Sequence, residues 1–377
     1  MKEEILHTAR LAVGYNKKPL IRDIEISIRP GQILTLIGPN GAGKSTILKS
    51  ITRQLEPISG TVYLGKQSIH QLNERDFAQT VSVMMTGWAE PELMRCEEVV
   101  ESGRFPYTGR LGILSAHDHK QVREAMELVH VTELAARDFN CISDGQRQRV
   151  MLARAICQEP DILVLDEPTS FLDIRHKLEL LSILKDLVRR KNLAVIMSLH
   201  ELDLAQKISD HVLCIRDDHV DRYGTPEEVF TDDYIRTLYR VDRGSYTGLY
   251  GSLELDAPQG KPQVFVIGGD GTGIPVYRRL QRLGIPFAAG ILHENDVDYP
   301  VANALACQVI TECAFEPITD TTVQHAQEVL CRCKKVICCL ERFGTMNQGN
   351  RQLMELARQR SMLVSKDEIR SSDINCT

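Results

Sequence analysis

The feature that most limits the fold of this chain is a glycine-rich segment that ends in a lysine and a serine. Residues 38–45 read GPNGAGKS and fit the pattern G-x-x-x-x-G-K-[ST]. The apolar run QILTLIG leads into the segment, and residues 44–55 have the spacing of a helix. A strand, such a loop and a helix point backbone N–H groups and a helix N-terminus at one spot, which suits phosphate oxygens. We therefore expect an α/β fold built around a triphosphate site.

The loop predicts a set of contacts to a triphosphate. Lys44 would reach the β- and γ-phosphates, and the Ser45 hydroxyl would ligate Mg²⁺. The alternative is a glycine-rich turn that binds nothing, which the flanking strand and helix disfavour. The residues expected to contact ATP here are Gly38, Pro39, Asn40, Gly41, Ala42, Gly43, Lys44, Ser45 and Thr46.

An acidic pair follows a second apolar run. Four apolar residues, ILVL, precede Asp166 and Glu167. At the end of a buried strand beside the phosphate loop, Asp166 can hold Mg²⁺ through water, and Glu167 can polarise the attacking water. We expect Glu167 to be catalytic and Asp166 to belong to the metal site.

A third motif lies just upstream of the acidic strand, where residues 141–155 read CISDGQRQRVMLARA. Its first part resembles the LSGGQ signature of the ATPase subunits of ABC transporters. In that family this helix start caps the γ-phosphate of an ATP held mainly by the other subunit. The resemblance covers roughly residues 5–240 and implies an ABC cassette with a RecA-like core, an antiparallel β subdomain and a helical subdomain. It also implies that Ser143, Gly145 and Gln146 contact ATP.

The same resemblance assigns three more residues. Tyr15 lies where an aromatic ring stacks on adenine, and Asp173 in SFLD matches the aspartate that communicates across the dimer. His200, which ends the run AVIMSLH, matches the switch histidine that contacts the γ-phosphate. Taken alone, Tyr15 would more often be a core residue and His200 a structural one.

Two positions depart from the family pattern. Thr86 stands where the family usually has a glutamine, and its shorter side chain could touch Mg²⁺ only through water. We expect this change to affect how the ATP site senses its membrane partner more than whether ATP binds. Asp144 replaces the middle glycine of the signature, and we expect its carboxylate to point away from phosphate.

Composition limits where such a chain can work. The net charge of −6 and the pI near 6.0 argue against a nucleic-acid binder. No run approaches the ~20 apolar residues that span a bilayer, and the start MKEEILHTAR is too charged for a signal peptide. We expect a peripheral protein on the cytoplasmic face of the cell membrane. Its expected partners are a second ATPase subunit in a homodimer, multi-span permease subunits and, indirectly, an extracytoplasmic substrate-binding protein.

The helical subdomain points to the transported molecule. GRFPY, residues 103–107, resembles the GRxPY element of importer ATPases for iron–siderophore complexes, haem and vitamin B12. On its own the segment could be a polar turn between helices. The resemblance favours an ATPase subunit that drives uptake of an iron complex, haem or cobalamin. The alternative is an exporter subunit or a soluble ABC-type ATPase with no role in metal-chelate uptake.

The chain continues past the cassette, which we place at residues 1–240. Residues 241–261 contain several glycines and predict a linker or a short joining hairpin. From 262 to 377 strands and helices alternate again, which predicts a Rossmann-like parallel α/β domain. The motif GGDGT in its first loop also resembles that of NAD and diacylglycerol kinases. This resemblance is only five residues long and the segment is much shorter than those enzymes, so we do not expect kinase activity.

Three loops of this second domain would meet at the carboxyl edge of its sheet, where ligands bind in such folds. They cover 268–273, 292–298 and 341–350, and the first has the layout of an anion site. We expect a ligand-sensing or dimerisation module with a small-molecule ligand. A packing domain with empty loops is the alternative. Cys331, Cys333, Cys338 and Cys339 are expected to be buried free thiols rather than metal ligands.

Overall fold

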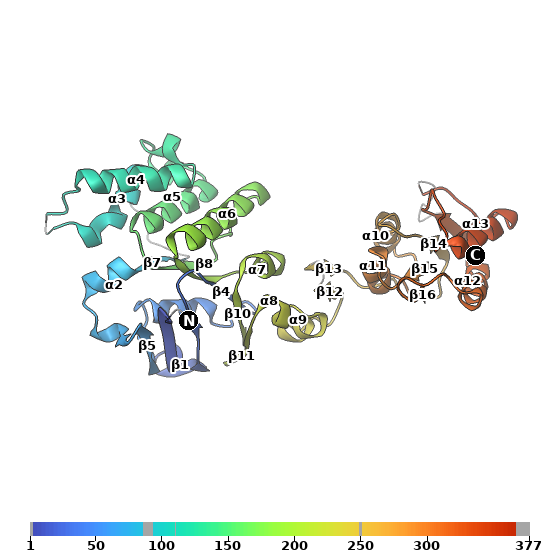
Figure 1. Cartoon of the computed structure of the whole chain (residues 1–377), viewed down its shortest axis with the longest axis horizontal. Coiled ribbons are helices and arrows are strands. Elements are labelled where there is room, and N and C mark those ends of the chain that lie inside the picture. The colour runs from blue at the N-terminus through green and yellow to red at the C-terminus, as the bar shows by residue number, and fades with distance from the viewer. Residues whose placement is uncertain (1–2, 86–92, 110, 249–250, 367–377) are drawn as a thin grey trace. The chain divides into compact units, whose positions relative to one another are not determined.

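The computed structural model describes residues 3–85, 93–109, 111–248 and 251–366. The chain divides into two compact units, Met1–Tyr239 and Arg240–Thr377 (Figure 1). Each unit has its own sheet and its own core, and each is described by itself below.

Parallel strands form the centre of the first unit, in the order β10-β4-β9-β8-β7. Every residue of β4, β8 and β9 is buried, as expected for parallel strands covered on both faces. β11 extends this sheet antiparallel to β10. The strands are β4 (Ile33–Ile37), β7 (Val81–Met84), β8 (Ile162–Asp166), β9 (Ala194–Ser198), β10 (His211–Arg216) and β11 (His219–Gly224).

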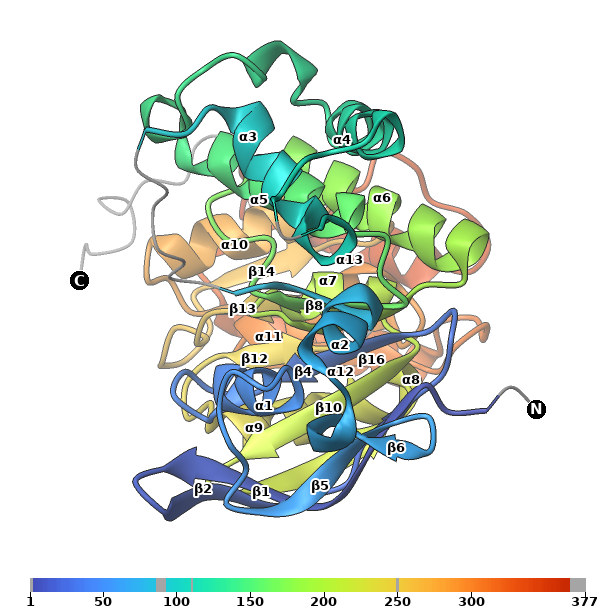
Figure 2. The same ribbon diagram turned by 90° about the vertical axis from the view of Figure 1, so that its left-hand side faces the viewer.

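An antiparallel group continues the sheet beyond β11. β1 lies between β2 and β5 and pairs antiparallel with both, and the parallel pairing of β2 with β11 joins the two parts. This group lies at the opposite end of the first unit from α3 and α4 (Figure 2). Its strands are β1 (Leu6–Tyr15), β2 (Lys18–Ile24), β3 (Ser27–Ile28), β5 (Ser59–Leu64) and β6 (Gln67–Ser68).

Helices complete the first unit. α3, α4 and α5 pack on one another and form the helical subdomain, and α1 follows β4 directly. The helices are α1 (Lys44–Ile51), α2 (Glu74–Thr80), α3 (Cys96–Glu101), α4 (Ala116–Leu128), α5 (Asp144–Cys157), α6 (Ile174–Lys191), α7 (Leu202–Ile208), α8 (Pro226–Val229) and α9 (Asp232–Tyr239).

The GRFPY segment makes buried contacts with two helices of the helical subdomain. Arg104 is 1% exposed, and its guanidinium donates to Asp118 of α4 at 2.9 Å and to Glu159 at 3.0 Å. It also donates to the Cys157 carbonyl at the end of α5. A side chain at Gly103 would lie only 2.3 Å from the Arg154 carbonyl oxygen, so glycine is required there. The segment therefore joins α4 to the end of the signature helix.

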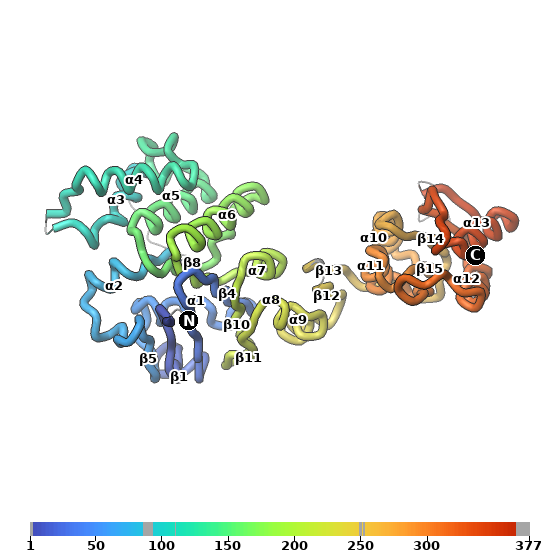
Figure 3. Tube along the Cα trace, viewed as in Figure 1, coloured from blue at the N-terminus to red at the C-terminus, as the bar shows by residue number. Residues whose placement is uncertain are grey.

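The second unit has a four-stranded parallel sheet in the order β16-β15-β14-β17. The chain moves outward from β14 through β15 to β16 and then returns to place β17 on the other side of β14. α10 and α11 lie on one side of the sheet, and α12 and α13 lie on the other (Figure 3). Buried side chains of the first pair share one core with the sheet, and those of the second pair share another. The elements are β14 (Val264–Ile267), α10 (Ile274–Arg282), β15 (Phe287–His293), α11 (Asp298–Leu305), β16 (Gln308–Glu312), α12 (Asp320–Arg332), β17 (Lys335–Cys338) and α13 (Gln348–Gln359).

Residues 241–261 contain a hairpin of β12 (Ser245–Thr247) and β13 (Ser252–Glu254). The Glu254 carboxylate is buried and pairs with Arg278 of α10, so the hairpin is fastened to the second unit.

The prediction that four cysteines of the second unit are buried free thiols is confirmed in part. Cys333 and Cys339 are buried free thiols, and Cys338 is half-buried. The prediction that Cys331 is buried is wrong, because it lies on the outer face of α12.

Candidate functional site

The phosphate loop joins β4 to α1, and close packing fixes its glycines. Gly38 has φ 150°, and a side chain there would come within 2.4 Å of the Ile215 carbonyl oxygen of β10. Gly43 has φ 95°, and a side chain there would meet Ile21 of β2 at 2.6 Å. Only glycine combines these left-handed conformations with such close approaches. The loop thus stands between the parallel and antiparallel parts of the sheet.

Lys44 lies over this loop. Its amino group donates to the Gly38 carbonyl at 2.8 Å and to the Pro39 carbonyl at 3.1 Å. Burial lowers the pKa of Lys44, and the carboxylates of Glu167 and Asp166 oppose that change. The amino group is therefore held by neutral acceptors in a place with little water, where an anion is a stronger partner.

Asp166 is almost fully buried at the end of β8. The Ser45 hydroxyl donates to its Oδ1 at 3.0 Å, and the Ser198 hydroxyl of β9 donates to the same oxygen at 2.7 Å. Ser198 also accepts the backbone N–H of Glu167 at 2.9 Å. Ser198 was not among the predicted site residues, and its one signal in the sequence is a hydroxyl two residues before His200 at the end of a buried strand.

Glu167 and His200 face one another. The His200 Nε2 lies 2.5 Å from the Glu167 Oε1, and the two side chains are 37% and 29% exposed. Ser170 donates to the other carboxylate oxygen at 3.2 Å. Glu167 has φ 50°, which turns its side chain away from the direction of the strand. The carboxylate is thus held at the surface of the site, where water can reach it.

A second residue that was not predicted links the signature helix to the backbone that follows β8. Gln148 of α5 is 4% exposed. Its Nε2 donates to the Glu167 carbonyl at 3.2 Å and to the Pro168 carbonyl at 2.5 Å. Polar side chains buried with such partners fix backbone position. Gln148 therefore sets where the chain turns after β8 relative to α5.

Seven of the fourteen residues predicted to bind the nucleotide line one cavity of about 600 Å³, together with the predicted catalytic residues Glu167 and His200. Gly38, Pro39 and Ala42 belong to the loop but do not line the cavity, and Asp166 lies behind Ser45. The lining residues are Tyr15, Leu20, Asn40, Gly41, Gly43, Lys44, Ser45, Thr46, Glu167 and His200. The Tyr15 side chain is half exposed, which fits a ring that can stack on a ligand better than it fits a core residue.

The signature residues lie apart from this cavity. Ser143 caps α5 by accepting the Gln146 N–H at 3.3 Å, and the Gln146 side chain accepts the Ser143 N–H at 3.0 Å. Asp144 pairs with Arg147 at 3.5 Å. Asp173 caps α6, since it accepts the His176 N–H at 2.9 Å. None of Ser143, Gly145, Gln146 and Asp173 is among the described residues that line the cavity. Thr86 lies outside the described residues.

This fold and site define an ATP-binding cassette, the ATPase module of ABC transporters. The ABC transporter family pattern matches residues 21–170, and the MJ0874 family pattern matches residues 287–376. An ABC transporter ATP-binding protein of Methanocaldococcus jannaschii is 42% identical over 277 residues, which cover 73% of this chain and 96% of that protein. The chain belongs to the family of ABC transporter ATP-binding proteins, as predicted.

Two further comparisons extend this result. A cobalamin import ATP-binding protein of Halobacterium salinarum is 34% identical over 314 residues, covering 81% of this chain and 78% of that protein. A solved inward-facing putative metal-chelate type ABC transporter contains a chain with a TM-score of 0.56 at 24% identity, covering 67% of this chain and 96% of that one. The cassette fold is thereby confirmed. Within the described residues no helix is long and apolar enough to cross a membrane.

Proposed function

We propose that this chain is the ATP-hydrolysing subunit of an importer. It would couple ATP binding and hydrolysis at a dimer interface to uptake of an iron complex, haem or cobalamin through a separate permease. The observation that carries the proposal is the convergence of Lys44, Ser45, Glu167 and His200 on one cavity. Cobalamin is included because the Halobacterium relative is a cobalamin import protein. Its alignment of 314 residues is longer than the first unit and so continues into the second.

In the proposed reaction the side chains that line the cavity stay there and exchange their present hydrogen-bond partners for ATP and water. Lys44 would turn from the Gly38 and Pro39 carbonyls to the β- and γ-phosphate oxygens of ATP. Glu167 would accept a hydrogen bond from the attacking water, and His200 would hold that carboxylate and face the γ-phosphate. Tyr15 would stack on the adenine ring.

The donor set fits Mg²⁺. The hydroxyl of Ser45 and the carboxylate of Asp166 are hard oxygen ligands, and they already lie 3.0 Å apart. When bound, Mg²⁺ neutralises charge that develops on the phosphates. Ser198 keeps the Asp166 carboxylate oriented for this role. Thr86 is proposed as a more distant member of the metal site.

The separation of the signature from the cavity supports a dimer. Ser143, Gly145 and Gln146 do not line the cavity of their own chain, so they would cap the nucleotide of a second copy. Asp173 would communicate across that interface. The proposed working place is the cytoplasmic face of the membrane, beside permease subunits that receive substrate from an extracytoplasmic binding protein. The second unit would serve as a regulatory or dimerisation module.

Uptake by cells that lack this chain tests the proposal. Labelled cobalamin, haem and ferric chelates are supplied separately, and the strain is complemented with the native chain or with Glu167→Gln. We expect uptake of at least one of these compounds to need the native chain and to fail with the variant. Unchanged uptake of all three classes would contradict an importer of metal chelates and favour the exporter or soluble ATPase.

A further inference from the structure

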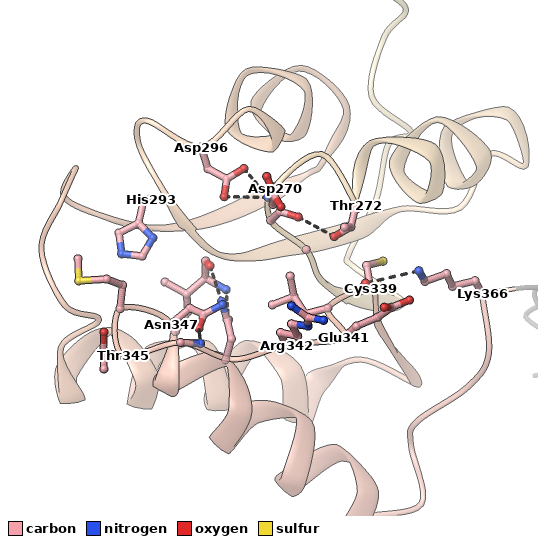
Figure 4. Close-up of a pocket in the computed structure, with 17 residues that line it drawn as sticks. Asp270, Thr272, His293, Asp296, Cys339, Glu341, Arg342, Thr345, Asn347 and Lys366 are labelled. Carbon is pink, nitrogen blue, oxygen red and sulfur yellow. Dashed lines mark hydrogen bonds between the residues drawn. The ribbon is translucent and has the colours of Figure 1, made fainter.

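The second unit has a cavity of about 630 Å³ at the carboxyl ends of β14, β15 and β17. The loop after β14 and the loop after β17 form two of its walls (Figure 4). From β14 the chain builds the sheet toward β16, and it then places β17 on the opposite side of β14. Open parallel sheets bind ligands at the point where the strand order reverses in this way. The volume lies in the range of small-molecule sites.

The glycine loop does not offer an anion site, contrary to the sequence prediction. The N–H groups of Gly269 and Gly273 both donate to the Asp298 Oδ2, at 2.7 and 2.8 Å. The N–H of Asp270 donates to the Asp296 carboxylate at 3.1 Å. Two carboxylates of the chain thus occupy the donors that a phosphate would need. A ligand phosphate must find its cations elsewhere in the cavity.

Two cations stand at the other end of the cavity. Arg342 follows β17, is exposed, and makes no hydrogen bond or ion pair with any other residue in the described ranges. The Lys366 amino group donates to the Cys339 carbonyl at 3.4 Å, which leaves it donors to spare. Glu341 lies on the same side, so this end carries one net positive charge (Figure 4).

Carboxylates and apolar side chains continue the cavity in the other direction. A second hollow of about 360 Å³ shares Asp270, His293, Asp296 and Met346 with the first and extends to two more apolar residues, Val297 and Phe315. Phe315 is 80% exposed, Val297 43% and Met346 38%. Exposed apolar side chains that gather beside a hollow mark a binding surface.

The two hollows form one groove with three successive chemistries, which are apolar, then acidic, then basic. The Asp296 carboxylate already accepts the N–H groups of Asp270 and Asp298. The Asp270 carboxylate has no partner among the described residues and lies where the two hollows meet. It is therefore a free acceptor for hydroxyl groups of a ligand.

We propose that this groove binds a nucleoside phosphate, a second nucleotide site that goes beyond ATP hydrolysis in the cassette. Phe315 and Met346 contact the base, Asp270 accepts hydrogen bonds from the ribose hydroxyls, and Arg342 and Lys366 bind the phosphate. Aromatic stacking, a carboxylate for hydroxyls and a cation pair for phosphate are the three contacts that such a ligand needs in this order. A bare anion would use the basic end alone and would leave the apolar and acidic parts empty.

Calorimetric titration of the full chain tests the site, with AMP, GMP, CMP and UMP each as a probe. Monophosphates lack the β- and γ-phosphates that Lys44 would grip in the cassette, and a Lys44→Ala background removes that contact as well. We expect at least one monophosphate to bind once per chain in both backgrounds. Arg342→Ala should weaken its binding about tenfold to a hundredfold, because it removes a charge-assisted hydrogen bond. Asp270→Asn should reduce the preference for the ribonucleotide over its dideoxy analogue.

Arg351→Ala is the matched control. Arg351 is an exposed arginine of the same unit that pairs with Glu355 on α13 at 3.1 Å and does not line the groove, so its loss should leave binding unchanged. Circular dichroism checks that each variant is folded. The proposal is overturned if none of the four probes binds at millimolar concentration. It is also overturned if binding disappears in Lys44→Ala but survives in Arg342→Ala, or if inorganic phosphate competes as well as the nucleotide.

Discussion

At the scale of single residues, Lys44 is the proposed phosphate-binding side chain of the loop. Its amino group is buried and, among the described residues, donates to the carbonyls of Gly38 and Pro39. We expect Lys44→Ala to weaken ATP binding by about tenfold or more, since a charge-assisted contact to phosphate is lost. Fluorescent-nucleotide titration measures this, and Lys49→Ala on the same helix is the control. Equal affinity in Lys44→Ala and the native chain would contradict the role given to Lys44.

Asp118 illustrates a charge that stabilises the helical subdomain. Burial pushes its pKa upward, but hydrogen bonds from Ser115 and Arg104 prevail and lower it to about 2, below its ordinary value of 3.8. A lowered folded-state pKa gives stability that is full above about pH 4 and is lost as pH falls toward 2. Asp118→Asn should therefore cost about 2 kcal/mol at pH 7 and much less near pH 2. Urea unfolding at both pH values checks this, and an equal cost at the two pH values would contradict it.

The sequence could predict that the phosphate loop, Asp166, Glu167 and His200 lie close together, because each stands in a contiguous motif with a mechanism. Their roles stay predictions. The sequence could not predict Ser198 or Gln148. Ser198 reaches Asp166 across 32 positions, and Gln148 reaches the Glu167 carbonyl across 19. Such contacts depend on how strands and helices pack, and a lone serine or glutamine carries no sequence signal of its partner.

At the scale of elements, β7 and α5 are joined where the core meets the helical subdomain. Gln158, at the end of α5, donates to the Val81 carbonyl at 3.0 Å, and Ser82 donates to Gln158 at 3.2 Å. β7 leads toward Thr86, which is outside the described residues. These contacts tie β7 to the end of the signature helix.

We expect Thr86→Gln to change stimulation of ATP hydrolysis by the permease more than basal hydrolysis. The longer side chain would reach nearer to the metal and alter how the two subdomains respond to the membrane partner. Hydrolysis with and without permease in lipid vesicles measures both quantities. An equal effect on the two rates, or none on either, would show that the substitution has no role in coupling.

In the second unit, the sequence predicted the order of elements but not the contacts of the first loop. The alternation of strands and helices correctly predicted a parallel sheet and the three loops at its edge. It placed an anion site at residues 268–273, because GGDGTG has the composition of one. The donors there are instead occupied by Asp298, which lies 29 positions after Gly269 and gave no signal in the sequence.

For the whole molecule, the role of the second unit is the question to test. The cassette contains phosphate loop, acidic pair, histidine and signature, so the second unit need not supply chemistry to it. A ligand on the second unit can influence the cassette only if it binds the open and closed dimers unequally, by about 1–3 kcal/mol for a 5–150-fold change.

Truncation after Tyr239, where the two units divide, separates the two roles. Loss of dimerisation with unchanged hydrolysis per dimer is the result expected if the second unit serves as a dimerisation module. Intact hydrolysis that no longer responds to nucleoside monophosphates is the result expected if the second unit is a regulatory module that binds a ligand. Analytical ultracentrifugation and ATPase assays make the distinction. A truncated chain with unaltered dimerisation, uptake and effector response would contradict both roles.

The central claim is that Glu167 activates water for ATP hydrolysis in a cavity shared by Lys44, Ser45 and His200. The most direct measurement is steady-state ATP hydrolysis by purified Glu167→Gln, beside a nucleotide-binding titration of the same protein. The glutamine keeps the size of the side chain but cannot accept the proton, so turnover should fall by about 10²-fold or more while ATP still binds. Hydrolysis at the native rate by a variant that binds ATP normally would contradict this account.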